Sequence, residues 1–276
     1  GSEMCIRDSI IPIVYAIYIS FFKKQMVGGT KFVGFENYAR LIQDPQFWSS
    51  VGRVTIFTVF QVPIMLFLAA AMALALDSMK LHGTKFFRIS TFLPYAVPAV
   101  VSTMIWGFVY GAKYGLVGSL NDFLGTNIDV LNPDVLLASI ANINTWEYAG
   151  YNMLIFYSSL STIPHSLYEA ASIDGCTTFG AYWRVVVPLI KPMTMTILVL
   201  NVLWVWNDFQ MPLIILNQDS STWTLPLFQY NFKSQYTYDY NMAFASYLIA
   251  MVPVMIAYIC AQKYIVAGLT QGAVKS

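Results

Sequence analysis

The chain has 276 residues, of which 57% are hydrophobic and only 11% are charged. A soluble domain usually carries about 25% charged residues, so this composition argues against a soluble enzyme and indicates a polytopic membrane protein. The net charge of +1 gives no electrostatic basis for binding nucleic acid. Cys5, Cys176 and Cys260 form neither a C-x-x-C pair nor a Cys/His cluster, which argues against a disulfide framework and a zinc site.

The first apolar run, residues 10–22, is shorter than the roughly 20 residues that cross a bilayer. We expect it to be a first transmembrane helix that has lost its N-terminal half. In the polar stretch that follows, Phe35, Tyr38, Leu41 and Ile42 recur at helical spacing, which predicts a short helix lying at the membrane surface. We therefore assign residues 1–50 to the remnant of this helix plus an external segment.

The rest of the chain predicts an all-α membrane domain over residues 51–265, about six transmembrane helices in all. The further spans are expected at 51–76, 89–111, 135–160, 190–216 and 242–262. Pro94 and Pro98 should bend the span that contains them. Residues 112–134 are rich in Gly, Asn and Asp and are expected to be a loop, and residues 266–276 a polar tail.

Charge alone does not orient these spans. A basic loop over residues 77–88 contains Lys80, His82, Lys85 and Arg88. Lysine and arginine residues nevertheless divide almost evenly between the two sets of loops, so the positive-inside rule gives no decision.

The segment "LYEAASIDGCTTFGAYWRVVVPLIKP" lies between the fourth and fifth spans, in the loop over residues 161–190. Pro164 suits the first turn of a helix, and Gly175 suits its C-terminal stop. Thr177 or Thr178 can cap a second helix, and Pro188 leads into the next span. The pattern therefore predicts a helix, a glycine turn and a second helix.

The first helix of this loop carries small residues between carboxylates. Ala170 and Ala171 would let another surface approach the backbone closely, and Glu169 and Asp174 could pair with a basic partner. These features are what a docking element needs. An amphipathic helix resting on lipid headgroups is the alternative reading of the same residues.

A resemblance then becomes specific. One pattern in this loop resembles the EAA signature of the permeases of ATP-binding-cassette (ABC) importers. It consists of Glu169-Ala170-Ala171, then three residues, Gly175, nine residues and Val185-x-Val187-Pro188, with valines where that family has Ile and Leu. Five further segments are similar to sequences of the carbohydrate-uptake branch of this family, the permeases of maltose- and glycerol-3-phosphate-type systems. These segments are "FVGFENYARLIQDPQFW", "NMLIFYSSLSTIP", "WNDFQMPLIIL", "TLPL" and "QKYIVAGLTQGAVK". The likeness runs from about residue 10 to the C-terminus.

The resemblance implies a type I importer transmembrane fold and a permease role in a bacterial-type plasma (inner) membrane. It implies that the 77–88 and 161–190 loops and the 266–276 tail are cytoplasmic, and that ATP and Mg²⁺ bind a partner ATPase subunit, so this chain holds no cofactor or metal and is not an enzyme. A second permease, either a related chain or another copy, and an extracellular solute-binding protein would complete the assembly. The residues implied to contact the ATPase are Glu169, Ala170, Ala171, Ser172, Asp174 and Gly175.

Substrate-contacting residues are expected where spans are polar, because polar groups in lipid are costly and usually face a pathway or a partner helix. Sugars are bound by aromatic faces together with amide and carboxylate groups. The candidate residues are Asn144, Trp146, Glu147, Tyr148 and Tyr151 in the fourth span, and Asn207 in the fifth. Residues that join helices to one another would give the same pattern.

Other functions fit the sequence less well, among them a purely structural membrane scaffold, which would leave the EAA pattern unexplained. A proton-coupled secondary transporter could use Glu147, although six spans with no twin half do not supply the inverted repeat common in that class. An enzyme has less support, because the sequence contains no G-x-S-x-G, H-E-x-x-H or Walker A motif, and both histidines fall in loops.

Overall fold

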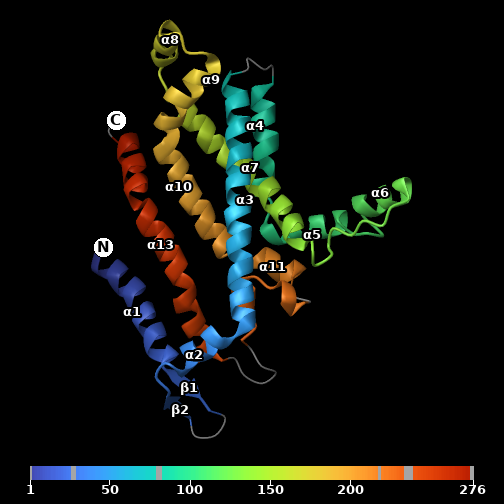
Figure 1. Cartoon of the computed structure of the whole chain (residues 1–276), viewed down its shortest axis with the longest axis vertical. Coiled ribbons are helices and arrows are strands. Elements are labelled where there is room, and N and C mark those ends of the chain that lie inside the picture. The colour runs from blue at the N-terminus through green and yellow to red at the C-terminus, as the bar shows by residue number, and fades with distance from the viewer. Residues whose placement is uncertain (1, 26–28, 79–82, 217–218, 233–238, 274–276) are drawn as a thin grey trace. The chain divides into compact units, whose positions relative to one another are not determined.

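The computed structural model describes residues 2–25, 29–78, 83–216, 219–232 and 239–273, and these are mostly helical (Figure 1). Lys80 and His82 of the predicted basic loop lie outside the described residues. The first half contains α1 (Ser2–Ser20), β1 (Phe22–Lys24), β2 (Thr30–Phe32), α2 (Glu36–Gln43), α3 (Pro45–Ser78), α4 (Thr84–Phe92), η1 (Leu93–Ala96), α5 (Ala99–Val109) and α6 (Leu116–Leu124). The second half contains α7 (Leu136–Leu160), α8 (His165–Ile173), α9 (Thr178–Ala181), η2 (Tyr182–Val186), α10 (Val187–Trp206), α11 (Gln210–Ile215), η3 (Ser220–Thr222), α12 (Leu225–Tyr230) and α13 (Tyr240–Ala273).

The chain divides into two compact units. Unit 1 comprises Gly1–Ile56 and Trp206–Ala257, and unit 2 comprises Phe57–Val205 and Tyr258–Ser276. Among the described residues, three helices are long and apolar enough to cross a membrane: Pro45–Asp77, Phe179–Ile215 and Tyr240–Lys263. The bent pair Thr84–Ala96 and Ala99–Val109 gives a fourth candidate. These segments match four of the predicted spans, and α13 continues through most of the stretch predicted as a tail.

The fourth predicted span corresponds to α7. At about 1.5 Å per residue its 25 residues are long enough for a hydrocarbon core of about 30 Å. Its polar residues make it less apolar than the other long helices. Twelve of its residues are buried inside the chain, including Asn144, Glu147 and Asn152, so these polar groups face protein rather than lipid.

The predicted bend at Pro94 and Pro98 is a full break. The helices on either side of it differ in direction by 99°. Pro98 has no N–H to donate, and it forces the preceding residue out of the helical region. Val97 accordingly is extended, with φ −80° and ψ 128°, and the helix restarts at Ala99.

The prediction of a loop over residues 112–134 is wrong for α6. Gly115 and Gly125 flank this helix, and Gly118, Asn121 and Asp122 lie within it. The Asn121 side chain accepts hydrogen bonds from the Ile128 N–H (2.9 Å) and the Thr126 hydroxyl (2.9 Å), and it donates to the Ile128 carbonyl (2.8 Å). Gly125 follows with φ +65°, a conformation that favours glycine, and ends the helix.

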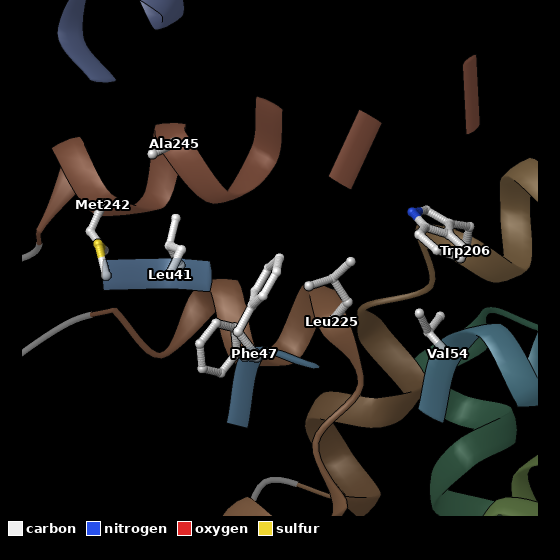
Figure 2. Close-up of a cluster of buried hydrophobic side chains, with 8 residues drawn as sticks. Leu41, Phe47, Val54, Trp206, Leu225, Met242 and Ala245 are labelled. Carbon is white, nitrogen blue, oxygen red and sulfur yellow. The ribbon is translucent and has the colours of Figure 1, made fainter. Parts of the chain in front are cut away.

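Unit 1 has a hydrophobic core to which α2, α3, α12 and α13 contribute (Figure 2). Leu41 of α2 is fully buried in this core, whereas Phe35 and Ile42 are exposed. The predicted amphipathic helix is therefore present, with its Leu41 side directed into the protein. The cluster comprises Leu41, Phe47, Val54, Trp206, Leu225, Phe228, Met242 and Ala245. A short antiparallel hairpin, β1 paired with β2, precedes α2 and was not predicted.

In unit 2, α7 packs closely against α4 and η1 (Figure 1). Gly150 makes this approach possible. A Cβ atom at position 150 would lie 1.9 Å from the Thr91 carbonyl oxygen and 2.5 Å from the Thr91 carbonyl carbon. Both atoms belong to the backbone, so they cannot move aside as a flexible side chain would.

We expect Gly150→Ala to lower the free energy of unfolding by about 1–3 kcal/mol, because α4 and α7 must separate to admit the methyl group. Thermal unfolding of the detergent-solubilised protein measures the effect. Gly107→Ala is the matched control, since Gly107 lies within α5 and a Cβ atom there would have no neighbour within 4 Å, and alanine at that position favours the helix. Equal stability of the two variants would contradict the packing argument.

Candidate functional site

The loop between α7 and α10 has the predicted helix, glycine turn and second helix. Gly175 has φ +74°. Around it, the Gly175 N–H donates to the Ser172 carbonyl (3.1 Å) and the Cys176 N–H to the Ala171 carbonyl (2.9 Å). These two bonds form the Schellman motif that ends many helices. The Thr177 hydroxyl oxygen accepts from the Gly180 N–H (3.2 Å) and caps α9, so the local predictions for this loop are confirmed.

The side chains of α8 divide into an inner and an outer face. Ala171 is only 6% exposed and lies on the helix that packs against α9 and η2. Glu169, Ala170, Ser172, Asp174 and Gly175 are exposed. Of the six residues predicted to contact a partner, Ala171 therefore packs against its own chain, and the other five lie on the surface.

An apolar surface accompanies the exposed carboxylates. Ile173 is 86% exposed, and Phe179 of α9 and Leu167 of α8 are also exposed. Burying such side chains against another protein is favourable by roughly 1.5–3 kcal/mol for each one fully removed from water. We call the outer face formed by Glu169, Ser172, Ile173 and Phe179 the coupling face.

The two loops predicted to be cytoplasmic lie at the same end of unit 2. The guanidinium carbon of Arg88, near the start of α4, is 5.0 Å from the ring centroid of Tyr157, near the end of α7. Burial and the nearby Asp77 carboxylate, at the end of α3, raise the pKa of the Tyr168 phenol in α8. One end of unit 2 therefore holds the last turns of α3 and α7 together with the first turns of α4 and α8.

The polar side chains of α7 are paired with neighbouring helices. The Ser102 hydroxyl donates to a carboxylate oxygen of Glu147 (3.3 Å), and Glu147 is only 3% exposed. At the opposite end of α7 from the coupling face, the Asn142 amide donates to the Tyr110 hydroxyl (2.8 Å). The amide nitrogen of Asn144, a residue that is also 3% exposed, has no hydrogen-bond partner among the described residues.

An amide pair joins α7 to α10. The Asn201 side-chain N–H donates to the Asn152 side-chain oxygen at 2.8 Å, and the Asn152 N–H donates in return at 3.2 Å. Each amide also donates to a carbonyl of its own helix. The sequence marks both residues as polar within spans, but it does not show that they face each other.

Next to this pair lies a group of aromatic rings from three elements. Tyr151 stacks on Tyr95 of η1, with ring centroids 4.6 Å apart and an interplanar angle of 18°. Tyr148 and Tyr151 both contact Trp204 of α10, at centroid distances of 6.0 and 5.9 Å. We call Tyr95, Tyr148, Tyr151 and Trp204 the aromatic cluster. Tyr95 was not predicted, although its place between two prolines inside a span could have drawn attention to it.

The remaining predicted pathway residues lie elsewhere. Trp146 contacts Trp106 of α5, with ring centroids 5.6 Å apart, rather than the aromatic cluster. Asn207 belongs to unit 1, where it lines a cavity of about 480 Å³. That cavity combines aromatic and amide groups with apolar side chains. Its lining includes Trp206, Asn207, Phe209, Gln229, Tyr230 and Tyr247.

Comparison with known proteins gives consistent matches. The model of a family described as "Binding-protein-dependent transport system inner membrane component" matches residues 11–271. The multiple sugar-binding transport system permease protein MsmG of Streptococcus mutans is 32% identical, over 96% of this chain and 92% of that protein. The probable starch degradation products transport system permease protein AmyC of Thermoanaerobacterium thermosulfurigenes is 30% identical, over 95% and 90% respectively.

A solved structure shows the same fold. The structure is that of a bacterial ABC transporter involved in the import of the acidic polysaccharide alginate. One of its chains superimposes with a TM-score of 0.80 at 19% identity, covering 95% of this chain and 92% of that one. The predicted all-α transmembrane fold of an importer permease is confirmed.

We expect Asn152 and Asn201 to be energetically coupled, because each amide satisfies the other and both residues are buried. In a double-mutant cycle with Asn152→Leu and Asn201→Leu, the coupling should be about 0.6 kcal/mol and at most about 1.7 kcal/mol. The free energy of unfolding in mixed micelles gives the four values. Thr145→Val is the control partner for Asn201→Leu, since the Thr145 hydroxyl donates within its own helix to the Ala141 carbonyl. Additive effects in the asparagine cycle would contradict the pairing.

Proposed function

The chain belongs to the family of binding-protein-dependent transport system inner membrane components, and we propose that it is the permease subunit of an ATP-driven importer of a sugar or a related polyol or sugar phosphate. The proposal rests on the family match over residues 11–271. The folded loop over residues 161–190, which we call the coupling loop, supports it. The named relatives are permeases of sugar and starch-product systems, which supports the substrate class.

The energy for transport comes from a partner chain. The sequence has no Walker A motif with which to hold ATP. We place the contact with an ATP-hydrolysing subunit on the coupling face, where exposed apolar side chains are bordered by the carboxylates of Glu169 and Asp174. Docking of this kind buries the apolar side chains and orients the helix through the charges at its rim.

The local structure of the loop suits the transmission of movement. The Schellman motif at Gly175 and the cap at Thr177 fix the turn between α8 and α9. The buried face of α8 packs on α9 and η2, and η2 continues directly into α10. A displacement of the coupling face is therefore passed to a transmembrane helix as a rigid-body movement. Closure of the ATPase subunits around ATP would draw two such faces together and change which side of the membrane the pathway faces.

Two further partners complete the proposed machine. A second permease, either a related chain or another copy of this one, would form the other half of the pathway. An extracellular solute-binding protein would deliver the substrate to the side opposite the coupling face, as the family's description implies. The assembly would reside in a bacterial plasma membrane, with the 161–190 loop in the cytoplasm.

Two regions have the chemistry to contact a sugar. In unit 2, the aromatic cluster offers ring faces beside Glu147 and the buried amide of Asn144. In unit 1, the cavity beside Asn207 offers amides and aromatic rings. Aromatic surface together with a few placed polar groups is typical of small-molecule sites.

The proton-coupled alternative finds no support in these comparisons. Glu147, the residue on which it depends, accepts a hydrogen bond from Ser102 within the bundle. A carboxylate held in this way can orient α5 against α7 without carrying protons.

Cross-linking tests the coupling face directly. In a chain lacking Cys5, Cys176 and Cys260, we expect Ser172→Cys to cross-link to a cysteine in the docking cleft of the co-expressed ATPase subunit, with a yield that changes on adding ATP. Ala171→Cys is the matched control, because Ala171 is the neighbouring residue and is buried. Equal yields from the two positions, or none from Ser172 in a correctly inserted protein, would count against the assignment.

Substitution of glycine tests whether the shape of the loop matters. Gly175→Pro removes the N–H that bonds to Ser172 and requires φ near −65° in place of +74°. We expect uptake of radiolabelled mono- to trisaccharides by cells expressing the complete transporter to fall at least about tenfold, which corresponds to about 1.4 kcal/mol.

Gly125→Pro is the control for the same experiment, because Gly125 also ends a short helix at positive φ and its N–H also donates to a helix carbonyl, that of Asn121. It lies outside the coupling loop and should retain most of the uptake. Normal uptake by Gly175→Pro, or equal losses in both variants, would contradict a specific coupling role. Membrane insertion of each variant is checked by immunoblot of the membrane fraction.

A further inference from the structure

Helix α6 presents three distinct faces. Gly118 and Asn121 are buried against the chain itself, whereas Ser119 and Asp122 are exposed and polar. The third face is apolar and exposed, and Phe123 at its centre is 85% exposed. The residues of this face, at spacings of four, seven and eight, are Leu116, Leu120, Phe123 and Leu124.

We propose that α6 is an interfacial anchor that inserts Leu116, Leu120, Phe123 and Leu124 into the hydrocarbon edge of the lipid bilayer. A helix in the membrane interface needs one apolar face toward the acyl chains and one polar face toward water. α6 has both, and its remaining face is attached to the protein. The proposal requires only that the chain is an integral membrane protein, and it does not depend on the sugar substrate.

The attachment fixes the direction of the apolar face. The N–H groups of Gly115 and Gly118 both donate to the Gly111 carbonyl (3.2 and 3.1 Å). A Cβ atom on Gly115 would lie 1.9 Å from the Phe108 carbonyl oxygen, so the turn between α5 and α6 is as tight as the backbone permits. At the other end, the Asn121 side chain binds the chain that follows α6. α6 is therefore rigidly held relative to α5.

The position of α6 along the chain places it in the half of the bilayer away from the coupling face. Thr84–Ala96 rises about 20 Å from the end of unit 2 that holds the coupling face, whereas the hydrocarbon core is about 30 Å thick. The chain then turns by 99° into α5. From there α5 runs beside the first half of α7, from Glu147 toward Asn142, at the end away from the coupling face. Figure 1 shows α6 extending away from α4 and α7.

Two observations favour lipid over a protein partner. The apolar face of α6 follows exposed apolar residues of α5, including Met104 and Phe108, so the exposed apolar surface continues from a candidate membrane span onto α6. Lys113 and Tyr114, both exposed, come directly before α6. Lysine and tyrosine at this place are typical of the membrane–water interface, where an ammonium meets phosphate and an amphipathic ring lies at headgroup depth.

Spin-label accessibility tests the proposal. In the cysteine-free chain, assembled with its partner subunits in phosphatidylglycerol–phosphatidylethanolamine vesicles, a nitroxide is attached at Phe123→Cys or at Asp122→Cys. The two positions are adjacent in sequence and about 100° apart around the helix. We expect the label at 123 to be several-fold more accessible to oxygen, which concentrates in lipid, than to a water-soluble nickel chelate. The label at 122 should show the reverse preference.

Either of two results would overturn the proposal. Chelate accessibility at position 123 equal to that at 122 would mean that the face lies in water. A label at 123 that is immobilised and inaccessible to both reagents would mean that another protein covers it. The pair Leu120→Cys and Ser119→Cys poses the same question if the first pair fails to insert, since these residues lie on the same two faces one turn earlier.

Discussion

The hydrocarbon core of a membrane offers no hydrogen-bond partners, and the arrangement of unit 2 follows from that constraint. Its α7 is the most polar of the long helices, and its amides and carboxylate are largely satisfied by neighbouring helices. Ser102 of α5 binds Glu147, and Asn201 of α10 binds Asn152. On a further side of α7, Gly150 permits the close approach of α4. Polar residues that would prevent a lone helix from entering lipid thus specify which helices surround it.

The sequence predicted most of the helices and the details of the coupling loop, because these depend on local signals. Proline, glycine and threonine at the ends of α8 and α9 determine caps and turns within a few residues. The unpredicted features depend on contacts that the sequence does not display. Gly and Asn around α6 indicated a loop because their hydrogen bonds to Gly111 and Ile128 were not visible. Ala171 was predicted to lie on the surface, because nothing in the sequence of α8 indicates that this side of the helix packs on α9 and η2.

The candidate substrate contacts show the same division. The polar and aromatic residues of the segment that forms α7 are visible in the sequence, and they led to the prediction of Tyr148 and Tyr151 as substrate contacts. Their stacking partner Tyr95 comes from the break at Pro94 and Pro98, which places a 3₁₀ turn beside α7. Trp146 lies only two residues before Tyr148, yet it contacts Trp106, because residues two apart on a helix point in different directions. Spacing on one helix can therefore sort residues by face, but it cannot tell which face meets the pathway.

The same geometry connects the coupling face to the aromatic cluster. α10 begins directly after η2, at the end of the coupling loop, and carries Asn201 and Trp204 close to its other end. Trp204 lies about 26 Å along the helix axis from Val187, at about 1.5 Å per residue. Since a packed helix moves largely as a rigid body, tilting its first turn displaces Trp204 relative to Tyr148 and Tyr151. The Asn152–Asn201 pair lies three residues before Trp204, about 4.5 Å along the axis, and resists sliding of α10 along α7 at that level. A push at the first turn of α10 would therefore reach the aromatic cluster as a small reorientation of Trp204 against Tyr148 and Tyr151 rather than as a sliding of the whole helix.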